Sequence, residues 1–442
     1  MKSNIEEMQK LAESLVDYAK SKGASQAQVS IGKSDDFSVS VLNGNIDKLE
    51  QAGSTGLGLK VIVEDKVATA SSSDLTKETL FKLIENAIER AKYSSVDKFS
   101  GLPEKEPLAT DSDSLKVFDP TIVELKPEFK ILTAKNLEKI CLADKRVTRS
   151  GGAYYATSIG ESCLANSNGF SGSSRKTNCY FGVEVMGGEG DNIFEDGWFT
   201  SAVNFKNLEN VEDVAKKALF RMTRLLGAKK IPTQTATIVY EPNMAESLLG
   251  FLAGTLYGSS IYMKRSLHAG KIGEQIANTN INVIDDGTLQ ELPGSRPYDG
   301  EGVPVRRNVI VENGILKSYL LDTYSSRKLN MKSTGNASGT NNFYLAAGSK
   351  SQEEIIKSVD KGLLLVRTVG QGTNSTTGDY SKGAYGMWIE KGEITYPIAE
   401  ITISGNLGTM LKNIEMVGSD LDLIHGLNAP TIKINDMTIS GT

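Results

Sequence analysis

Histidine and cysteine are scarce in this chain of 442 residues, which contains two histidines and three cysteines. Two imidazoles, His268 and His425, are too few to build a histidine-rich metal site. The cysteines at positions 141, 163 and 179 are odd in number and form no C-x-x-C pair. This pattern argues against a thiolate zinc site and a disulfide framework, and it favours a reducing cytoplasm.

Positive charge is not in excess either, because 49 Lys and Arg residues face 54 Asp and Glu residues. Proteins that bind nucleic acid usually carry a basic patch that matches the phosphate backbone, so we expect no nucleic-acid partner. The most apolar uncharged stretch, residues 247–263, includes three glycines and is too short for a membrane span of about 20 residues. Residues 1–7 turn acidic without an apolar signal region. We therefore expect a cytoplasmic protein with no membrane association.

The length and composition predict a multi-part protein rich in turns. At roughly 150 residues per domain, the chain corresponds to about three compact units. Hydrophobic residues make up 39% of it, and 43 glycines without a collagen-like period indicate many tight turns between strands. We divide the chain into an N-terminal domain (1–98), a linker (99–116), a middle domain (117–230) and a C-terminal domain (231–442).

Apolar periodicity predicts the class of fold. Spacings of three and four residues predict helices at 5–21, 75–91, 127–143, 211–226, 245–256, 353–360 and 407–414. Alternating residues predict strands, among them separate strands at 27–31 and 37–41, a meander over 152–205, and a strand at 315–321 that follows an Asn313-Gly314 hairpin turn. The predicted class is α+β: an N-terminal α/β unit of antiparallel hairpins flanked by helices, a middle β-meander unit, and a β-rich C-terminal domain with a few helices.

Motifs of common catalytic chemistries are absent from the sequence. There is no G-x-S-x-G nucleophile elbow, and Gly56-x-Gly58 lacks the third glycine of a dinucleotide loop. Asp299 and Glu301 flank Gly300 and could act as paired carboxylates, but a turn that enters the next strand explains them as well. Composition and spacing alone therefore indicate an α+β protein without a readable catalytic centre.

Several passages in the second half of the chain resemble one known family. They read SLLGFLAGTLYG at 247–258, YSSRKL at 324–329 with STGNA at 333–337, TGDYSKGAYG at 377–386 with WIEKGE at 388–393, and ITISGNL at 401–407. In this order they resemble the TldD/PmbA family, on its PmbA (TldE) branch. A looser similarity at 42–60 extends the resemblance over essentially the whole chain.

This resemblance implies a heterodimeric cytoplasmic peptidase that processes peptides and degrades small unfolded proteins. In the TldD branch, a helix with His-Glu-x-x-x-His and a later cysteine hold a metal whose activated water attacks the peptide bond. The corresponding stretch here, 245–256, has no histidine, and no cysteine follows Cys179. We therefore expect no catalytic residue, metal ligand or cofactor in this chain, and zinc only in a TldD-like partner subunit.

The two carboxylates beside Gly300 and five residues of these motifs are the predicted contacts to a peptide or a partner. They are Asp299, Glu301, Thr334, Gly335, Asn336, Asp379 and Tyr380. The preferred hypothesis is a non-catalytic subunit that encloses the chamber of a metal-bearing partner and presents extended peptides by strand addition. A homodimer is also expected to form in isolation. Two alternatives stay open: a stand-alone hydrolase that uses the carboxylates among these residues with Tyr380, and a pure binding or modulator protein.

Overall fold

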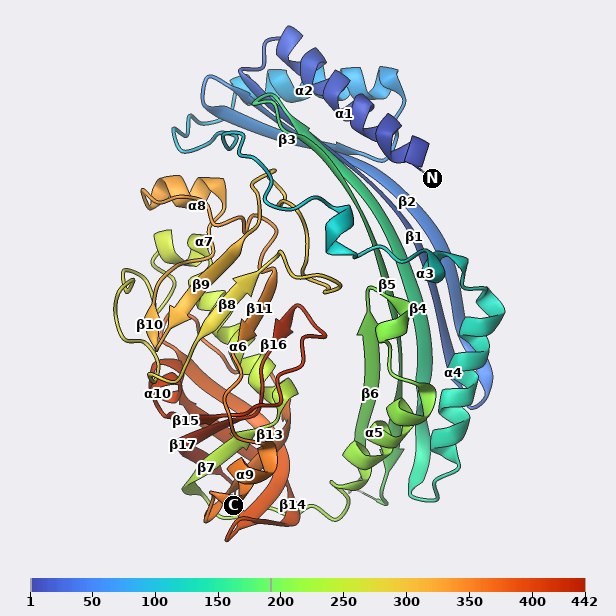
Figure 1. Cartoon of the computed structure of the whole chain (residues 1–442), viewed down its shortest axis with the longest axis vertical. Coiled ribbons are helices and arrows are strands. Elements are labelled where there is room, and N and C mark those ends of the chain that lie inside the picture. Colours follow the sequence, from blue (N-terminus) through green and yellow to red (C-terminus); the bar gives the residue numbers. More distant parts are fainter. Residues whose placement is uncertain (1, 191–192, 442) are drawn as a thin grey trace.

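A strongly curved sheet of six antiparallel strands forms one side of the molecule in the computed structural model, which describes residues 2–190 and 193–441 (Figure 1). The strand order is β3-β2-β1-β4-β5-β6. The strands are β1 (Gln26–Leu42), β2 (Asn45–Val63), β3 (Lys66–Ser72), β4 (Val147–Asn166), β5 (Ser171–Gly187) and β6 (Phe194–Ala202). Because β1 pairs with β4, the N-terminal and middle segments of the chain share this sheet.

Strand β1 is longer than the sequence pattern predicts. The prediction of separate strands at 27–31 and 37–41 was wrong, because both belong to one continuous strand. The polar residues between them interrupt the apolar alternation but not the ladder, since Ser34 lies opposite Ser54 of β2 and Gly160 of β4. Backbone hydrogen bonds to both neighbours continue the strand where side-chain burial gives no signal.

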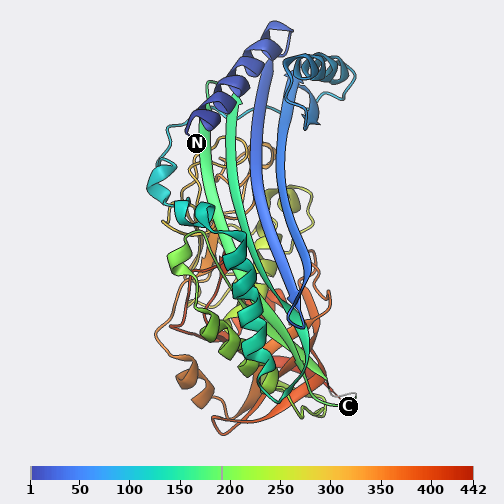
Figure 2. The same cartoon turned by 90° about the vertical axis from the view of Figure 1, so that its right-hand side faces the viewer.

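Four helices cover the convex face of the curved sheet. They are α1 (Lys2–Ser21), α2 (Lys77–Lys92), α4 (Pro127–Leu142) and α5 (Val211–Thr223). Figure 2 looks onto this face, with α4 in front of the strands. Because side chains alternate along a strand, Ile31 packs with Leu80 beneath α1 and α2, and Val39 packs with Leu137 beneath α4. Ser38, which alternates with them, belongs to the concave face that looks toward the rest of the molecule.

The C-terminal unit contains two sheets with a helix between them. Their strand orders are β14-β13-β12-β7-β17-β15 and β10-β9-β8-β11-β16. The strands are β7 (Gln234–Tyr240), β8 (Val283–Asp286), β9 (Arg307–Glu312), β10 (Ile315–Leu316), β11 (Asn342–Leu345), β12 (Lys361–Val369), β13 (Asp379–Glu390), β14 (Glu393–Asn406), β15 (Ile414–Val417), β16 (Leu427–Asn428) and β17 (Ile432–Ser440). Helix α6 (Pro242–Leu256) packs against β16 of one sheet and against β7 and β12 of the other. Its buried side chains therefore join the two sheets into one core.

The predicted fold class and helices are confirmed. Each of the seven predicted helices is present to within a few residues of its expected ends. Two of the seven are short: α9 (Gln352–Lys357) and α10 (Leu407–Lys412). Three further short helices complete the described α-helices: α3 (Pro120–Glu124), α7 (Gly258–Tyr262) and α8 (Thr323–Lys328). The hairpin between β9 and β10 turns at Asn313 and Gly314, both with positive φ. The strand predicted at 315–321 ends at Leu316, because the following residues leave the hairpin and form a single bridge beside the end of α6.

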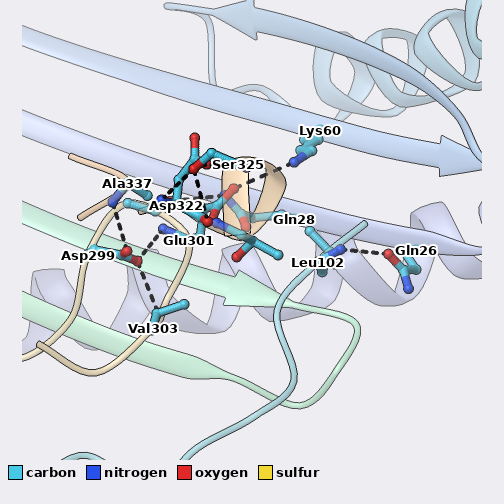
Figure 3. A network of polar contacts seen from close by, with 12 residues as sticks. Gln26, Gln28, Lys60, Leu102, Asp299, Glu301, Val303, Asp322, Ser325 and Ala337 are labelled. Atoms are coloured by element: carbon cyan, nitrogen blue, oxygen red, sulfur yellow. Dashed lines mark hydrogen bonds and ion pairs between the residues drawn. The ribbon is translucent and has the colours of Figure 1, made fainter. Parts of the chain in front are cut away.

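Residues 97–117, here called the strap, cross from the curved sheet to the start of the middle segment. The Leu102 N–H donates to Gln26 Oε1 (2.8 Å), and the Leu102 carbonyl accepts from Arg327 Nη2 (2.8 Å; Figure 3 shows the first contact). Leu102 and Leu115 are buried. The segment predicted as a linker is therefore packed against both units, whereas the domain boundaries stay a prediction. None of the described helices has the length and apolar character of a membrane span.

Candidate functional site

Polar contacts at two ends hold the C-terminal unit against the concave side of the sheet. At one end, a carboxylate oxygen of Glu301 lies 3.9 Å from Lys60 Nζ on β2 (Figure 3). At the other end, Arg224 beyond α5 donates two hydrogen bonds to the Glu241 carboxylate, 2.5 and 2.9 Å long. Between these ends the two units enclose hollow space.

This space consists of two cavities, which we call together the interunit cleft. Cavity 1 has a volume of about 780 Å³ and lies between β5, the start of α6 and three loops of the C-terminal unit. Cavity 2 has a volume of about 530 Å³ and lies between β5, β6 and the start of α6. Asn243, Glu246 and His425 line both cavities, so they form the boundary between them.

The start of α6 reaches the cleft because β7 ends there. Pro242 is the first residue of the helix, where its missing N–H leaves no bond unmade. Asn243, Glu246 and Ser247 are three and four residues apart, so they share the helix face that lines cavity 1. The rest of α6 is mostly hydrocarbon and is buried between the two sheets. Only the first turns of this helix can therefore contribute chemistry to the cleft.

Glu246 makes no hydrogen bond or ion pair with any residue that the structure describes. Burial raises its pKa to about 7, and the Asp422 carboxylate adds to the rise. Beside it, the His425 ring packs against Phe199 of β6 with 5.4 Å between the ring centroids. Burial lowers the pKa of His425. The boundary of the two cavities thus carries a carboxyl group that changes its charge near neutral pH.

Cavity 1 is positively charged. Lys176 on β5 donates from Nζ to the Pro293 carbonyl. Arg296, in the loop between β8 and β9, donates from Nε to Asn341 Oδ1 (2.7 Å) and from Nη2 to the Thr340 carbonyl (2.7 Å). Burial, together with the charge of Arg296, lowers the pKa of Lys176 to about 8. Both side chains thus bring partly buried positive charge to the same wall.

Cavity 2 has the opposite character. Its charged lining residues are Glu184, Asp196, Glu209, Glu246, Asp420, Asp422, Lys217 and Arg221. Two of these acids are neutralised locally, since Asp196 pairs with Arg221 (3.2 Å) and Glu209 pairs with Lys217 (2.6 Å). Aromatic rings of β4 and β6 complete the lining. The cleft therefore changes from positive in cavity 1 to negative in cavity 2.

The other histidine lies away from the cleft, in the core of the C-terminal unit. His268 is buried, and its Nδ1 lies 2.8 Å from Thr255 Oγ1 of α6. Burial lowers its pKa to about 4, so the ring is neutral at physiological pH. His268 therefore braces the end of α6.

The cleft residues do not fit the zinc site of a metallopeptidase. Such a site needs three protein ligands with nitrogen, oxygen or sulfur donors and one open position. Helix α6 offers the cleft a single ionisable side chain, Glu246. Within residues 2–190 and 193–441, no three His, Cys, Asp or Glu side chains are grouped so that they could hold a metal ion.

Asp299 and Glu301 lie together in a turn between the two units. Asp299 is buried, and its carboxylate accepts hydrogen bonds from the N–H groups of Glu301, Val303 and Ala337 (2.9, 3.0 and 2.9 Å; Figure 3). Burial raises its pKa, and these hydrogen bonds oppose the rise. Glu301 accepts from the Thr323 N–H (2.9 Å) and faces Lys60. Both carboxylates thus bind the protein's own backbone and side chains.

The predicted residues Thr334, Gly335 and Asn336 form the next loop. Gly335 has φ +75°, and a Cβ there would lie 2.8 Å from the Pro304 carbonyl, so only glycine fits without strain. Thr334 Oγ1 accepts from the Leu321 N–H and donates to Asn336 Oδ1 (both 2.7 Å). Asn336 Nδ2 in turn donates to the buried Asp285 carboxylate (2.8 Å). The structure brings this loop beside Asp299, through the Ala337 N–H.

Asp379 and Tyr380 lie elsewhere, at the start of β13. Asp379 is exposed and accepts a hydrogen bond from Thr377 Oγ1 (2.6 Å). Tyr380 is buried in the core, with its ring 6.4 Å from that of Phe251 on α6. None of the seven predicted contact residues is among the described residues that line the two cavities. Their role in binding a peptide or a partner stays a prediction.

The cleft residues themselves were missed by the sequence reasoning. Lys176, Arg296 and His425 come from three separate regions and share no motif. One signal for Glu246 was available, because it is the single charged residue from position 242 to 263. A lone charge at the start of an apolar helix indicates a point where the helix leaves the core.

Comparisons with known proteins agree with this architecture. Family models described as PmbA/TldA metallopeptidase domain 1, central domain and C-terminal domain match residues 27–91, 120–226 and 233–441. The Metalloprotease PmbA of Escherichia coli O157:H7 is 33% identical over 446 residues, which cover 99% of this chain and 98% of that protein. A crystal structure of a protein from Bacteroides thetaiotaomicron has 29% identity and a TM-score of 0.92, covering 98% of both chains.

A partial match links the chain to a second branch of the same proteins. A Metalloprotease TldD homolog of Buchnera aphidicola is 32% identical over 204 residues, which cover 40% of this chain and 42% of that protein. The fold and the matched regions define a three-part α+β protein of the metallopeptidase type. The chain belongs to the PmbA/TldD family, and its full-length similarity is to PmbA.

Proposed function

We propose that this chain is a non-catalytic PmbA/TldE-type subunit of a cytoplasmic peptidase, in which a TldD-like subunit carries the zinc. The observation that supports this role is the character of α6. The helix packs hydrocarbon between two sheets and turns Asn243, Glu246 and Ser247 toward the cleft. A helix of this kind suits the wall of a chamber, while the partner subunit activates the water that cleaves the peptide.

The interunit cleft supports an unfolded or small peptide as the ligand. Cavity volumes of about 780 and 530 Å³ lie in the range of roughly 300–1,000 Å³ that ligand sites usually have. An extended segment of a few residues fills such a volume. The three cysteines are unpaired and buried, which accords with a reducing compartment.

The test compares this chain, a TldD-type subunit from the same organism, and their mixture. Zinc content, complex formation and cleavage of an internally quenched unfolded peptide are measured for each. We expect this chain alone to hold no stoichiometric zinc, to cleave nothing and to run as a homodimer. The mixture should form a heterodimer whose cleavage a chelator abolishes. Zinc-dependent cleavage by this chain alone would refute the proposal.

Single variants separate this proposal from a stand-alone hydrolase. Asp299→Asn, Glu301→Gln and Asp379→Asn each remove one carboxylate that such a hydrolase could use. In a non-catalytic subunit, these changes affect stability or partner binding, which thermal unfolding and light scattering detect. In a stand-alone hydrolase, they abolish turnover by the isolated chain.

A further inference from the structure

Lys176 and Arg296 are two partly buried cations that share one wall of cavity 1 without an acidic partner. Lys176 donates to the main-chain carbonyl of Pro293. Arg296 donates to the Asn341 side chain and to the carbonyls of residues 339 and 340, all through Nε and Nη2. Among the described residues, neither cation forms an ion pair, and Arg296 Nη1 has no hydrogen-bond partner. Donors of both side chains are thus free to bind a ligand.

Two acids attract Arg296, but they are already engaged. Burial lowers the pKa of Arg296, and the carboxylates of Asp285 and Asp299 only oppose this effect. Asp285 accepts hydrogen bonds from Asn336 and from the backbone and side chain of Asn341. Asp299 accepts three backbone N–H groups. These carboxylates hold the loops around the cavity and do not bind the cations directly.

Two other partly buried arginines are neutralised by acids. Arg221 and Arg224 have side chains that are 12% and 9% exposed, and they pair with Asp196 and Glu241. In cavity 1, by contrast, Arg296 and Lys176 repel each other, and this repulsion contributes to the lowered pKa of Lys176. Burying like charges side by side is unfavourable unless an anion lies between them. The arrangement indicates a site that a ligand completes.

We propose that Lys176 and Arg296 bind the carboxylate group of a peptide that lies in the interunit cleft. This inference rests on the proposed function, which supplies the peptide. An ammonium and a guanidinium group can each donate to one carboxylate, and such charge-assisted bonds are the strong ones. Ser338 and Thr340 belong to the same lining. Arg175 also belongs to this lining, and its guanidinium group, stacked on the Phe118 ring at 4.4 Å, adds a third positive charge.

The charge of the second cavity favours a peptide over a polyanion. A nucleic acid that enters cavity 1 would place its next phosphates toward the acids of cavity 2, where like charges repel. A peptide with a single carboxylate meets no such repulsion. The carboxylate comes either from the peptide's C-terminus or from an acidic side chain, and the two sources are distinguishable.

The experiment titrates the isolated full chain with three blocked pentapeptides, using ligand-observed NMR. The first is acetylated penta-alanine with a free C-terminal carboxylate, and the second is the same peptide as a C-terminal amide. The third is the amide with glutamate at its centre. We expect the first or the third to bind at least about tenfold more tightly than the second, because hydrogen bonds between ions are at stake. Equal binding of all three, or no binding, would overturn the inference.

Matched variants locate the site. Lys176→Met keeps the length of the side chain without its charge, and we expect it to weaken binding of the preferred peptide about tenfold. Lys176→Arg should restore most of the affinity. Lys206→Met removes the same charge from an exposed residue that pairs with Glu291, so its affinity should stay within twofold. Unchanged affinity in a folded Lys176→Met protein would refute the site.

A second variant guards against misfolding. If Lys176→Met loses its circular dichroism spectrum, Arg175→Gln still tests the site. The Arg175 guanidinium makes no hydrogen bond or ion pair with the described residues, so the fold depends little on it. We expect Arg175→Gln to bind the preferred peptide about threefold more weakly, because one positive charge is lost. An unchanged affinity would count against the inference.

The result is separable from the fate of the proposed function. Binding is measured on the isolated chain, without the partner subunit. Cleavage products in the NMR spectra would contradict the non-catalytic role and leave the carboxylate site intact. A Lys176→Met chain could also lose binding of the carboxylate and yet support cleavage by the partner at the wild-type rate. That result would leave the proposed subunit role standing, and it would show that the carboxylate site is not needed for cleavage.

Discussion

The curved sheet and the C-terminal unit bury their apolar surfaces in different ways. The curved sheet is covered by helices on its convex face, and its concave face carries many polar residues together with aromatic rings of β4 and β6. The C-terminal unit closes two sheets around α6, so that apolar side chains meet on both sides of the helix. The curved sheet therefore presents a long, largely polar surface. The C-terminal unit presents polar side chains to the cleft only where its elements leave the core.

This difference explains the composition of the cleft. Lys176 reaches cavity 1 because it lies on the concave face of β5, opposite Gly160 of β4. From the C-terminal unit, the cleft receives loops and the first turns of α6, including Glu246. The cleft thus combines the face of a rigid sheet with loops, and loops on a rigid scaffold often carry binding residues.

The largest expected effect comes from the doubly covered helix. Leu252→Ala on α6 removes a side chain that is 2% exposed and leaves a cavity between two sheets. We expect a loss of about 3 kcal/mol in the free energy of unfolding, measured by urea denaturation. Leu132→Ala, the same change on α4 at a side chain that is 65% exposed, should cost below about 1 kcal/mol. Equal losses would show that Leu252 is not packed between the two sheets.

A smaller loss in the free energy of unfolding is expected where α4, on the convex face, binds the β1–β2 turn at the end of the sheet. Glu138 of α4 is buried and accepts hydrogen bonds from the N–H groups of Asn43 and Gly44 (both 2.8 Å) at the β1–β2 turn. Glu138→Gln replaces one charged acceptor by an N–H₂ group and should cost about 2 kcal/mol. Glu78→Gln, on exposed α2 surface, is the matched control and should change stability by less than about 0.5 kcal/mol. Equal thermal shifts in the two variants would show that the turn does not depend on the helix.

The loop at 334–336 should behave as a brace of the C-terminal unit. Asn336→Ala removes a donor to the buried Asp285 carboxylate and should lower the free energy of unfolding by about 1–2 kcal/mol. Gln51→Ala removes an exposed amide of β2 and should have no measurable effect on stability. Peptide binding that falls in Asn336→Ala without loss of stability would instead give this loop a direct contact with the ligand.

The smallest effect depends on pH and concerns Glu246. Its pKa in the folded protein is raised to about 7 above a usual value near 4.5, so folding favours the protonated form. Stability from this group is therefore lost as the pH rises from about 4.5 to about 7. Glu246→Gln should be more stable than the wild type by about 1 kcal/mol at pH 8, after allowance for its partial exposure, and equally stable at pH 4. A difference that does not vary with pH would show that Glu246 keeps an ordinary pKa.

Much of the fold was predictable because an element that is buried on one side carries apolar residues at regular spacings in the sequence. Helices α1, α2 and α4 each face a sheet on one side, and their apolar residues repeat every three to four positions. The Asn313-Gly314 turn was predictable because its positive φ angles favour these residues. The pairing of β1 with β4 was not predictable, since it joins segments more than 100 residues apart whose polar central residues carry no register signal.

The cleft was less predictable than the fold for a related reason. Lys176 and Arg296 are 120 positions apart and meet only because the C-terminal unit is held against the sheet. Asn336, by contrast, lies in a recognisable motif, and in the structure it binds the protein's own Asp285. A motif reflects contacts between residues that are close in the sequence, whereas a cleft between units depends on how surfaces from distant parts of the sequence pack together.

The strap and the contacts at both ends of the cleft fix the distance between the two units, and so the width of the cleft. Arg327 and Leu102 join the units near one end, and Arg224 and Glu241 join them at the other. A cleft that is joined at both ends has a fixed width and selects its ligands by their thickness. We expect such a cleft to admit a single extended strand more readily than an α-helix of roughly 10 Å diameter. Under the proposed function, a peptide that is helical in solution must therefore unfold before it binds in the cleft.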